Sequence, residues 1–158
     1  FARQQRLDLR AIALPQFLGR LVDLWRPVAA ARDIALHLDI APDVPGLTAD
    51  EDKLRRVLDN LVKNAIEAID QGPGHVEVLA RRAADDRVRI AVSDTGPGIP
   101  ASVEVFRLFE TTKRSGSGLG LSIAKQIVVA HGGHIGFERL SPNGTTFYVD
   151  LPARVAAV

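Results

Sequence analysis

The sequence predicts an α/β fold: a two-layer α/β sandwich in which about three helices pack on a single face of one mixed, mostly antiparallel sheet. Two observations lead to this prediction. Segments with helical periodicity are combined with short segments in which apolar residues recur at every second position. In addition, no linker, repeat or low-complexity tract divides the 158 residues, 46% of which are apolar and 25% charged. Such a length and composition are typical of one globular domain with its own core.

The first half of the chain predicts two helices separated by a strand. Residues 14–31 place large apolar side chains on one helical side, and a proline near the start favours a helix that begins there. Pro27 should bend or strain this helix. Residues 34–40 alternate apolar and other side chains, as a half-buried strand does. Asp50 is the expected cap of the second helix, which should end near Ile69.

The second half predicts strands, a long glycine-rich loop, a third helix and a final hairpin. Residues 94–120 contain many glycines and hydroxyl side chains without apolar periodicity, and loops of this length usually serve a function. Asp85 and Asp86 are expected to turn the chain between two strands, and two glycines after His131 can end the third helix. The expected strands are 76–78, 88–92, 135–139 and 145–151, and the expected helix is 122–131.

The composition excludes several kinds of partner and site. Lysine and arginine (20) nearly cancel aspartate and glutamate (19), and a net charge of +1 gives no reason to expect nucleic acid or an anionic membrane as a partner. Without cysteine, the chain can form neither disulfides nor thiolate metal sites. No apolar run approaches the ~20 residues of a membrane span. Because methionine is absent even from the first position, we expect a piece of a longer protein.

Two asparagines interrupt the second helix. Asn60 and Asn64 are one turn apart, at the rim of the stripe that Leu58, Leu61 and Ala65 should bury. Asparagine is a mediocre helix former, so two of them in a strong helix need a reason. An amide oxygen can coordinate Mg²⁺ while the amide NH₂ group reaches a phosphate. Two solvated asparagines would give the same pattern, and the helix alone leaves both interpretations open.

A short glycine-containing segment follows the strand expected at 88–92. In Asp94-Thr95-Gly96-Pro97-Gly98, the glycines permit backbone angles and close approaches that other residues do not. A carboxylate at the end of a strand could accept a hydrogen bond from an exocyclic amine such as that of adenine. Taken alone, the segment is better explained as a tight turn.

A second glycine-rich segment, Thr111 to Ser122, leads into the third helix. Small residues before a helix leave several backbone N–H groups free to bind an anion, and Lys113 and Arg114 add positive charge that can reach a triphosphate. The segment lacks the Gly-Lys-Ser/Thr of a P-loop, and its spacing differs from the dinucleotide-binding pattern. A flexible, solvated loop is the simpler alternative for this segment by itself.

Together, the order and spacing of these segments resemble those of the ATP-binding domain of sensor histidine kinases. This domain belongs to the gyrase–Hsp90–histidine kinase–MutL superfamily and has the Bergerat-type ATP-binding fold. The resemblance extends over roughly residues 7–152, and the Thr-Thr-Lys lid is similar to that of the nitrogen-regulation and oxygen-sensing branch. The matching segments are the N box (60–65), the G1 box (94–98), the F box and lid (106–113), the G2 box (116–121) and the last glycine-bearing strand (143–147).

The resemblance implies ATP as substrate and Mg²⁺ as cofactor. Asp94 would bind the adenine amino group, and Asn64 would coordinate the Mg²⁺ that bridges the phosphates, with Asn60 beside it. Lys63 would contact phosphate, although a solvated surface lysine explains it equally well. The implied catalytic residues, which position the γ-phosphoryl group and stabilise its charge, are Asn60, Asn64 and Lys113. The other implied nucleotide contacts are Gly96, Gly98, Ile99, Thr111, Thr112, Lys113, Gly116, Ser117, Gly118, Leu119, Gly120 and Thr145.

One position distinguishes a histidine kinase from a hydrolase of the superfamily. The hydrolases carry a glutamate, the base that activates water, one turn before the asparagine that binds Mg²⁺. This chain has Asn60 there, which cannot accept a proton near neutral pH, whereas a neutral histidine nucleophile needs no such base. The sequence therefore favours a protein-histidine kinase over two alternatives, a hydrolytic ATPase and a non-catalytic nucleotide-sensing module. Arg107 and Leu108 depart from the family's F box and put the docking of the lid in question.

The histidine that receives the phosphoryl group is not evident in the chain. None of the four histidines has the helical His-Glu/Asp context of the family's acceptor; they are His37, His75, His131 and His134. The resemblance therefore implies a separate histidine-bearing dimerisation domain of the same kinase as partner, and a downstream response regulator. Residues 1–10 are expected to hold the tail of the upstream acceptor helices and a first strand, 11–153 the catalytic domain and 154–158 a tail. The fragment should be monomeric and cytoplasmic, by itself or as the cytoplasmic part of a membrane-bound sensor.

Overall fold

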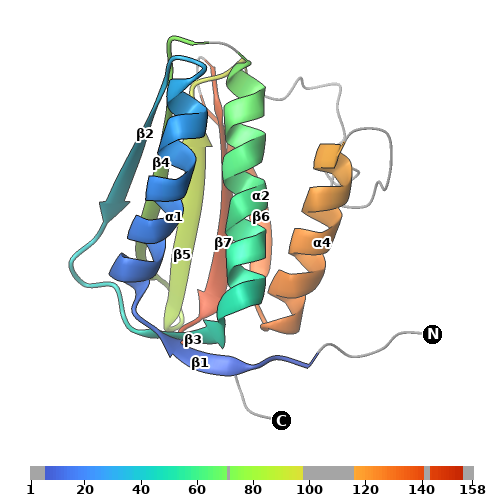
Figure 1. The fold of residues 1–158 in the computed structure, drawn as a ribbon. Coiled ribbons are helices and arrows are strands. Elements are labelled where there is room, and N and C mark those ends of the chain that lie inside the picture. Colours follow the sequence, from blue (N-terminus) through green and yellow to red (C-terminus); the bar gives the residue numbers. More distant parts are fainter. Residues whose placement is uncertain (1–5, 71, 98–115, 141–142, 155–158) are drawn as a thin grey trace.

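The computed structural model describes residues 6–70, 72–97, 116–140 and 143–154. In these ranges, three helices cover one face of a five-stranded sheet, and a two-stranded ribbon lies at one end of the sandwich (Figure 1). The helices are α1 (Leu14–Ala30), α2 (Glu51–Ile69) and α4 (Gly116–Ala130). No helix in the described ranges is both long and apolar enough to cross a membrane.

The five-stranded sheet is mixed and mostly antiparallel, as predicted. Its strand order is β2-β4-β5-β7-β6, in which only β2 and β4 run parallel. Alternate residues such as Val78 and Val92, which are cross-strand partners, turn inward and are fully buried under the helices. The strands are β2 (Ile34–Ile40), β4 (Gly74–Ala83), β5 (Arg87–Asp94), β6 (His134–Arg139) and β7 (Thr145–Pro152).

Local signals set most of the boundaries where the sequence predicts them. Asp85 and Asp86 turn the chain from β4 to β5 with φ values of 60° and 57°, a conformation that aspartate tolerates better than most residues. Gly132, with φ of 76°, follows the end of α4. Helix α1 contains Pro27 and still continues to Ala30. The predicted helices at 14–31 and 50–69 and the predicted strand at 34–40 are therefore confirmed.

Helix α4 begins earlier than the sequence predicts. We expected it at 122, but the helical backbone starts at Gly116 and includes the glycine-rich segment. Glycine disfavours helices by about 1 kcal/mol relative to alanine, which is why the pattern indicates a loop. Tertiary packing outweighs this propensity, because Gly120 is buried directly against the side chain of Asn60 on α2. A residue with a Cβ could not approach α2 as closely.

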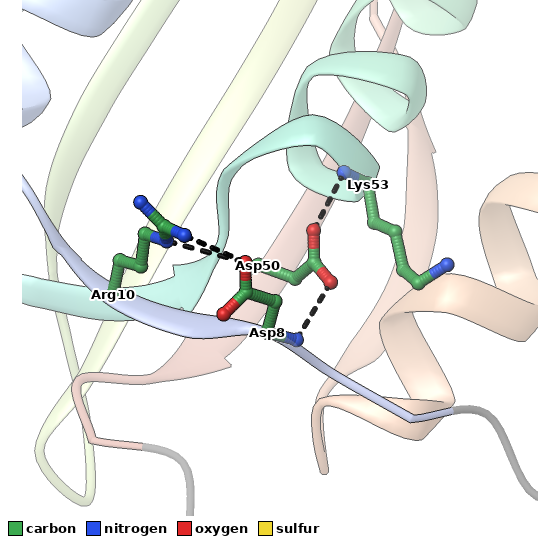
Figure 2. Close-up of polar contacts among 4 residues, drawn as sticks. All are labelled: Asp8, Arg10, Asp50 and Lys53. Atoms are coloured by element: carbon green, nitrogen blue, oxygen red, sulfur yellow. Dashed lines mark hydrogen bonds and ion pairs between the residues drawn. The ribbon is translucent and has the colours of Figure 1, made fainter.

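The ribbon formed by β1 (Leu9–Ile12) and β3 (Leu47–Asp50) joins the start of the chain to the start of α2. Strand β1 continues beyond the ten residues in which we expected a first strand, and β3 was not predicted. Figure 2 shows the junction: Asp50 accepts hydrogen bonds from the backbone N–H groups of Lys53 (3.1 Å) and Asp8 (2.9 Å). Asp50 is thus the N-cap of α2, as predicted, and also holds the chain entering β1.

Candidate functional site

The polar residues singled out in the sequence gather at the end of the sandwich opposite the β1–β3 ribbon. Strand β5 ends there with Asp94, and β7 begins there with Thr145, which is its cross-strand partner. The C-terminal half of α2 and the N-terminus of α4 reach the same end (Figure 1). The end of β5, the start of β7 and the start of α4 therefore meet beside α2. The sheet register aligns Asp94 with Thr145, and close contacts of Gly96 and Gly120 with α2 fix the other positions.

Asp94 is a buried carboxylate held by backbone donors. Only 3% of its surface is exposed, and the N–H of Gly96 donates a 2.9 Å hydrogen bond to its Oδ1. Burial raises the pKa of the Asp94 carboxyl above its ordinary value, while hydrogen bonds with the backbone of Gly96 and Thr145 act in the opposite direction. A carboxylate has about four lone-pair sites, so these two backbone donors leave acceptor capacity for a ligand amine.

Two glycines bring backbone close to Asp94. A Cβ on Gly96 would lie 2.8 Å from the carbonyl oxygen of Ala68, at the end of α2. Gly144, with φ of 111°, packs so closely on the carbonyl oxygen of Asp94 that a Cβ there would overlap it. The segment after β5 is therefore pressed between α2 and the turn before β7, and glycine is required at both contacts.

Asn64 carries an unsatisfied donor. Its Nδ2 atom is buried and has no hydrogen-bond partner among the described residues. A buried NH₂ group without a partner costs about 1–3 kcal/mol, so such a group needs an explanation, for example a catalytic role or a bound water or ion. Asn64 is half-buried and Lys63, its neighbour, is exposed. The predicted position of Asn64 at the rim of the buried stripe is thus confirmed.

Asn60 lies where α2 meets α4. Its Nδ2 donates to the carbonyl oxygen of Arg56 at 3.1 Å, and its Oδ1 would lie 2.6 Å from a Cβ on Gly120. The first four N–H groups of α4, at residues 116–119, have no acceptor within the helix. Together with the helix dipole, these groups make the start of α4 attractive to an anion.

Next to Asn60, a cleft of about 380 Å³ runs between α2 and α4. It is lined by Asp52, Arg55, Arg56, Asp59, Asn60, Gly120 and Ile123. Arg56 was not among the predicted site residues, although it precedes Asn60 by four residues, the same spacing that separates Asn60 from Asn64. This i, i+4 spacing, which places all three side chains on the same side of α2, is the signal in the sequence that indicates Arg56.

The structure brings some of the expected residues together and does not describe others. Asp94, Gly96 and Thr145 form one cluster, and Asn60 and Gly120 form a second contact on the neighbouring helices. For residues 116–119, only the course of the backbone is described. The expected contacts Gly98, Ile99, Thr111, Thr112 and Lys113, and the F box at 106–113, lie outside the described residues.

The described histidines have structural environments. His131 is buried at the end of α4, where its Nε2 accepts a 3.0 Å hydrogen bond from the N–H of Asp50 and its Nδ1 lies 2.9 Å from the carbonyl oxygen of Ile127. His37 and His75 stack on adjacent strands. Among the described residues, no group of three or more histidine, cysteine or acidic side chains could hold a metal ion.

Comparison with known proteins identifies the kind of domain. The sequence model described as histidine kinase-, DNA gyrase B-, and HSP90-like ATPase matches residues 49–155. The alginate biosynthesis sensor protein KinB of Pseudomonas aeruginosa is 37% identical over 153 residues, which are 94% of this chain and 25% of KinB. The C4-dicarboxylate transport sensor protein DctB of Rhizobium meliloti is 40% identical over 154 residues, which are 96% of this chain and 24% of DctB. The chain thus spans about a quarter of the length of these relatives.

Solved structures with the same fold are parts of histidine kinases. The full-length protein ShkA in complex with AMPPNP superposes with a TM-score of 0.87 and 30% identity, over 99% of this chain and 34% of ShkA. The nucleotide-free catalytic domain of histidine kinase ThkA gives a TM-score of 0.82 and 29% identity, over 94% of this chain and 97% of that domain. The predicted fold class is therefore confirmed over the length of an entire catalytic domain. From the family match, the relatives and the fold, we conclude that the chain belongs to the histidine kinase-, DNA gyrase B- and HSP90-like ATPase family and corresponds to the part of sensor proteins that forms the catalytic domain of ThkA.

Proposed function

We propose that this domain binds Mg-ATP between α2, the end of β5 and the start of α4, and transfers the γ-phosphoryl group to a histidine on a separate dimerisation domain of the same kinase. The observation that carries the proposal is the pairing of a buried carboxylate, Asp94, with an unsatisfied amide donor, Asn64, on elements of an ATP-binding fold. The carboxylate suits an amine of the base, and the amide suits a phosphate with its metal.

The adenine end of the nucleotide belongs at Asp94. A carboxylate in a dry site accepts a hydrogen bond from the adenine amino group and has no donor to offer the carbonyl oxygen of guanine. Gly96 keeps backbone, instead of a side chain, next to this carboxylate. Gly98 and Ile99 complete the proposed base pocket. Asp94→Asn should therefore weaken ATP binding more than GTP binding, and equal affinity of the unaltered domain for both nucleotides would contradict the assignment.

The phosphate end belongs at Asn60, Asn64 and the start of α4. The residues fit Mg²⁺ because an amide oxygen is a suitable ligand, and the orphaned Nδ2 of Asn64 can donate to a phosphate oxygen. When bound, Mg²⁺ neutralises the charge that the phosphates carry. The backbone N–H groups at 116–119 add donors at this end, and Lys63, Thr111, Thr112 and Lys113 are the other proposed phosphate contacts. Thr145, the cross-strand partner of Asp94, belongs to the base end. Lys113 is also the proposed lid residue that stabilises the transferred group.

Transfer to histidine suits this site better than hydrolysis does. Hydrolysis needs a base to activate water, and Asn60 stands where the base of the hydrolases would be. Asn60 is also held by Arg56 and Gly120, so it can position a group but cannot remove a proton. A neutral imidazole brings its own lone pair. Among the described residues, no histidine offers an acceptor on a helix, which agrees with an acceptor on another domain.

The proposed partners follow from the separation of the catalytic domain from the domain that carries the acceptor histidine. The acceptor histidine would lie on the dimerisation domain of the same kinase, and a response regulator would receive the phosphoryl group through the full-length protein. We propose that the domain by itself is monomeric, does not bind nucleic acid, and acts in the cytoplasm, where ATP is available. The near-balanced net charge of +1 supports the lack of affinity for nucleic acid.

Calorimetry and turnover of the isolated domain test the nucleotide part of this proposal. We expect ATP to bind, Mg²⁺ to tighten its binding, and hydrolysis without an acceptor to be slow. Rapid hydrolysis would favour the hydrolytic ATPase, and absence of Mg-ATP binding would favour a non-catalytic module. Lys125→Ala serves as a control, because Lys125 lies on α4 beside a different pocket, near β6.

A further inference from the structure

Arg56 is an unpaired cation next to the proposed phosphate site. It is exposed on α2, lines the cleft that also contains Asn60 and Gly120, and its guanidinium has no hydrogen-bond or ion-pair partner in the part of the chain that the structure describes. Its neighbour Arg55 differs, because it forms an ion pair with Asp59 (3.5 Å), which also accepts from the indole of Trp25. The charge of Arg56 is therefore available for a ligand.

The direction in which ATP would lie along α2 brings its last phosphate toward Arg56. The base end is fixed near Ala68, whose carbonyl oxygen abuts Gly96. Ala68, Asn64, Asn60 and Arg56 are successive members of one i, i+4 row, so each step moves about 6 Å toward the N-terminus of α2. If the metal lies at Asn64, the next members of the row are Asn60, which contacts Gly120 of α4, and then Arg56, so the last phosphate points toward Arg56.

From this row, we propose that the guanidinium of Arg56 binds the γ-phosphate of ATP at the mouth of the α2–α4 cleft and makes the site discriminate a nucleoside triphosphate from a diphosphate. The inference rests on the proposed function and deepens it. Arginine is suited to this role because its planar fork donates two parallel hydrogen bonds to phosphate oxygens. The two acidic residues in the cleft do not oppose it, since Asp59 is paired with Arg55 and Asp52 is exposed to solvent.

The test compares the affinities for AMPPNP and ADP, both with Mg²⁺, in the unaltered domain and in Arg56→Ala. We expect Arg56→Ala to weaken AMPPNP binding about tenfold and ADP binding less than about twofold, because only the γ-phosphate contact is lost. Arg56→Lys should lie between the two, since lysine keeps the charge but not the fork. Arg20→Ala, which removes an exposed arginine on α1 that does not line the cleft, should leave the ratio of the two affinities unchanged.

The possible outcomes separate the inference from the function on which it rests. An unchanged AMPPNP-to-ADP ratio in Arg56→Ala, or an equal change in Arg20→Ala, would overturn the inference while leaving Mg-ATP binding intact. Equal weakening of both nucleotides would also overturn it, because the guanidinium would then act on a shared part of the ligand. Failure of the unaltered domain to bind either nucleotide would overturn the proposed function, and the inference with it.

Discussion

The backbone of Gly120 lies against the side chain of Asn60, so that a Cβ on Gly120 would be 2.6 Å from Asn60 Oδ1. This contact connects the glycine-rich start of α4 with the asparagine row of α2, and it fixes how close the two helices approach. The missing side chain on one helix thus determines the position of a proposed catalytic side chain on the other. Adding a side chain at Gly120 therefore provides a direct test of the site.

Gly120→Ala should displace Asn60 and impair the site more than the fold. Alanine favours a helix by up to about 1 kcal/mol over glycine, which offsets part of the cost of the clash. We expect Mg-ATP affinity to fall severalfold while the free energy of unfolding changes little, as measured by calorimetry and urea denaturation. Gly19→Ala is the matched control, because Gly19 is also helical and has open space around it. It should raise the free energy of unfolding by about 0.5–1 kcal/mol and leave binding unchanged.

Asn64→Ala should separate binding from stability. The native Nδ2 atom is buried without a partner in the described structure, so its removal relieves a cost that offsets the lost packing. We expect the free energy of unfolding without nucleotide to change by less than about 1 kcal/mol, and the tightening of ATP binding by Mg²⁺ to disappear. A large loss of stability, with Mg²⁺ still tightening the binding of ATP, would show that Asn64 is a structural residue.

Asp94 should make stability depend on pH in a recognisable direction. Because burial raises the pKa of Asp94 above its ordinary value of 3.8, the native state keeps the proton to a higher pH than the unfolded chain does. Between the ordinary and the raised pKa, the native state binds more protons, and stability therefore falls as pH rises. Asp94→Asn lacks this dependence.

Urea denaturation of both proteins, in steps from below pH 3.8 to neutral pH, measures the effect of Asp94. The free energy of unfolding of the unaltered domain, minus that of Asp94→Asn, should decrease as pH rises and become constant above the raised pKa. Other titrating groups cancel in this difference. A difference that increases with pH would mean that the backbone N–H groups of Gly96 and Thr145 outweigh burial.

Asp50→Ala should destabilise the fold at the end of α2 that is remote from the proposed nucleotide site. The substitution removes the acceptor of the N–H groups of Lys53 and Asp8 (Figure 2), and loss of an N-cap costs about 1–2 kcal/mol. We expect a fall of this size in the free energy of unfolding with nearly unchanged nucleotide affinity. Asp52→Ala, an exposed acidic residue in the same first turn, should cost less than about 1 kcal/mol.

Much of the fold could be predicted because its signals are local. Apolar alternation identified the strands, and an aspartate cap and a glycine marked the ends of α2 and α4. Strand β3 escaped prediction because its four residues are stabilised by β1, whose paired residues lie 35 to 41 positions away in sequence. The early start of α4 also escaped, since the packing of Gly120 on Asn60 is a tertiary effect that no local propensity contains.

The residue types of the candidate site could be predicted from the sequence, but the burial and hydrogen bonding of these residues could not. The sequence indicated Asp94 and Asn64. Only the structure shows that the carboxylate of Asp94 is buried among backbone donors, and that the amide nitrogen of Asn64 lacks a hydrogen-bond partner among the described residues. Arg56 was overlooked because an exposed arginine on a helix has no distinctive pattern. Its lack of an ion-pair partner, beside a neighbour that has one, becomes visible only in the structure.

The most direct test of the account is transfer of label from γ-labelled Mg-ATP to the histidine-bearing dimerisation domain of the same kinase. We expect acid-labile, base-stable label on that domain only when this chain is also present, and loss of that label with Asn64→Ala. Tight binding of Mg-ATP without label on the dimerisation domain would contradict it, as would stable label on this chain alone.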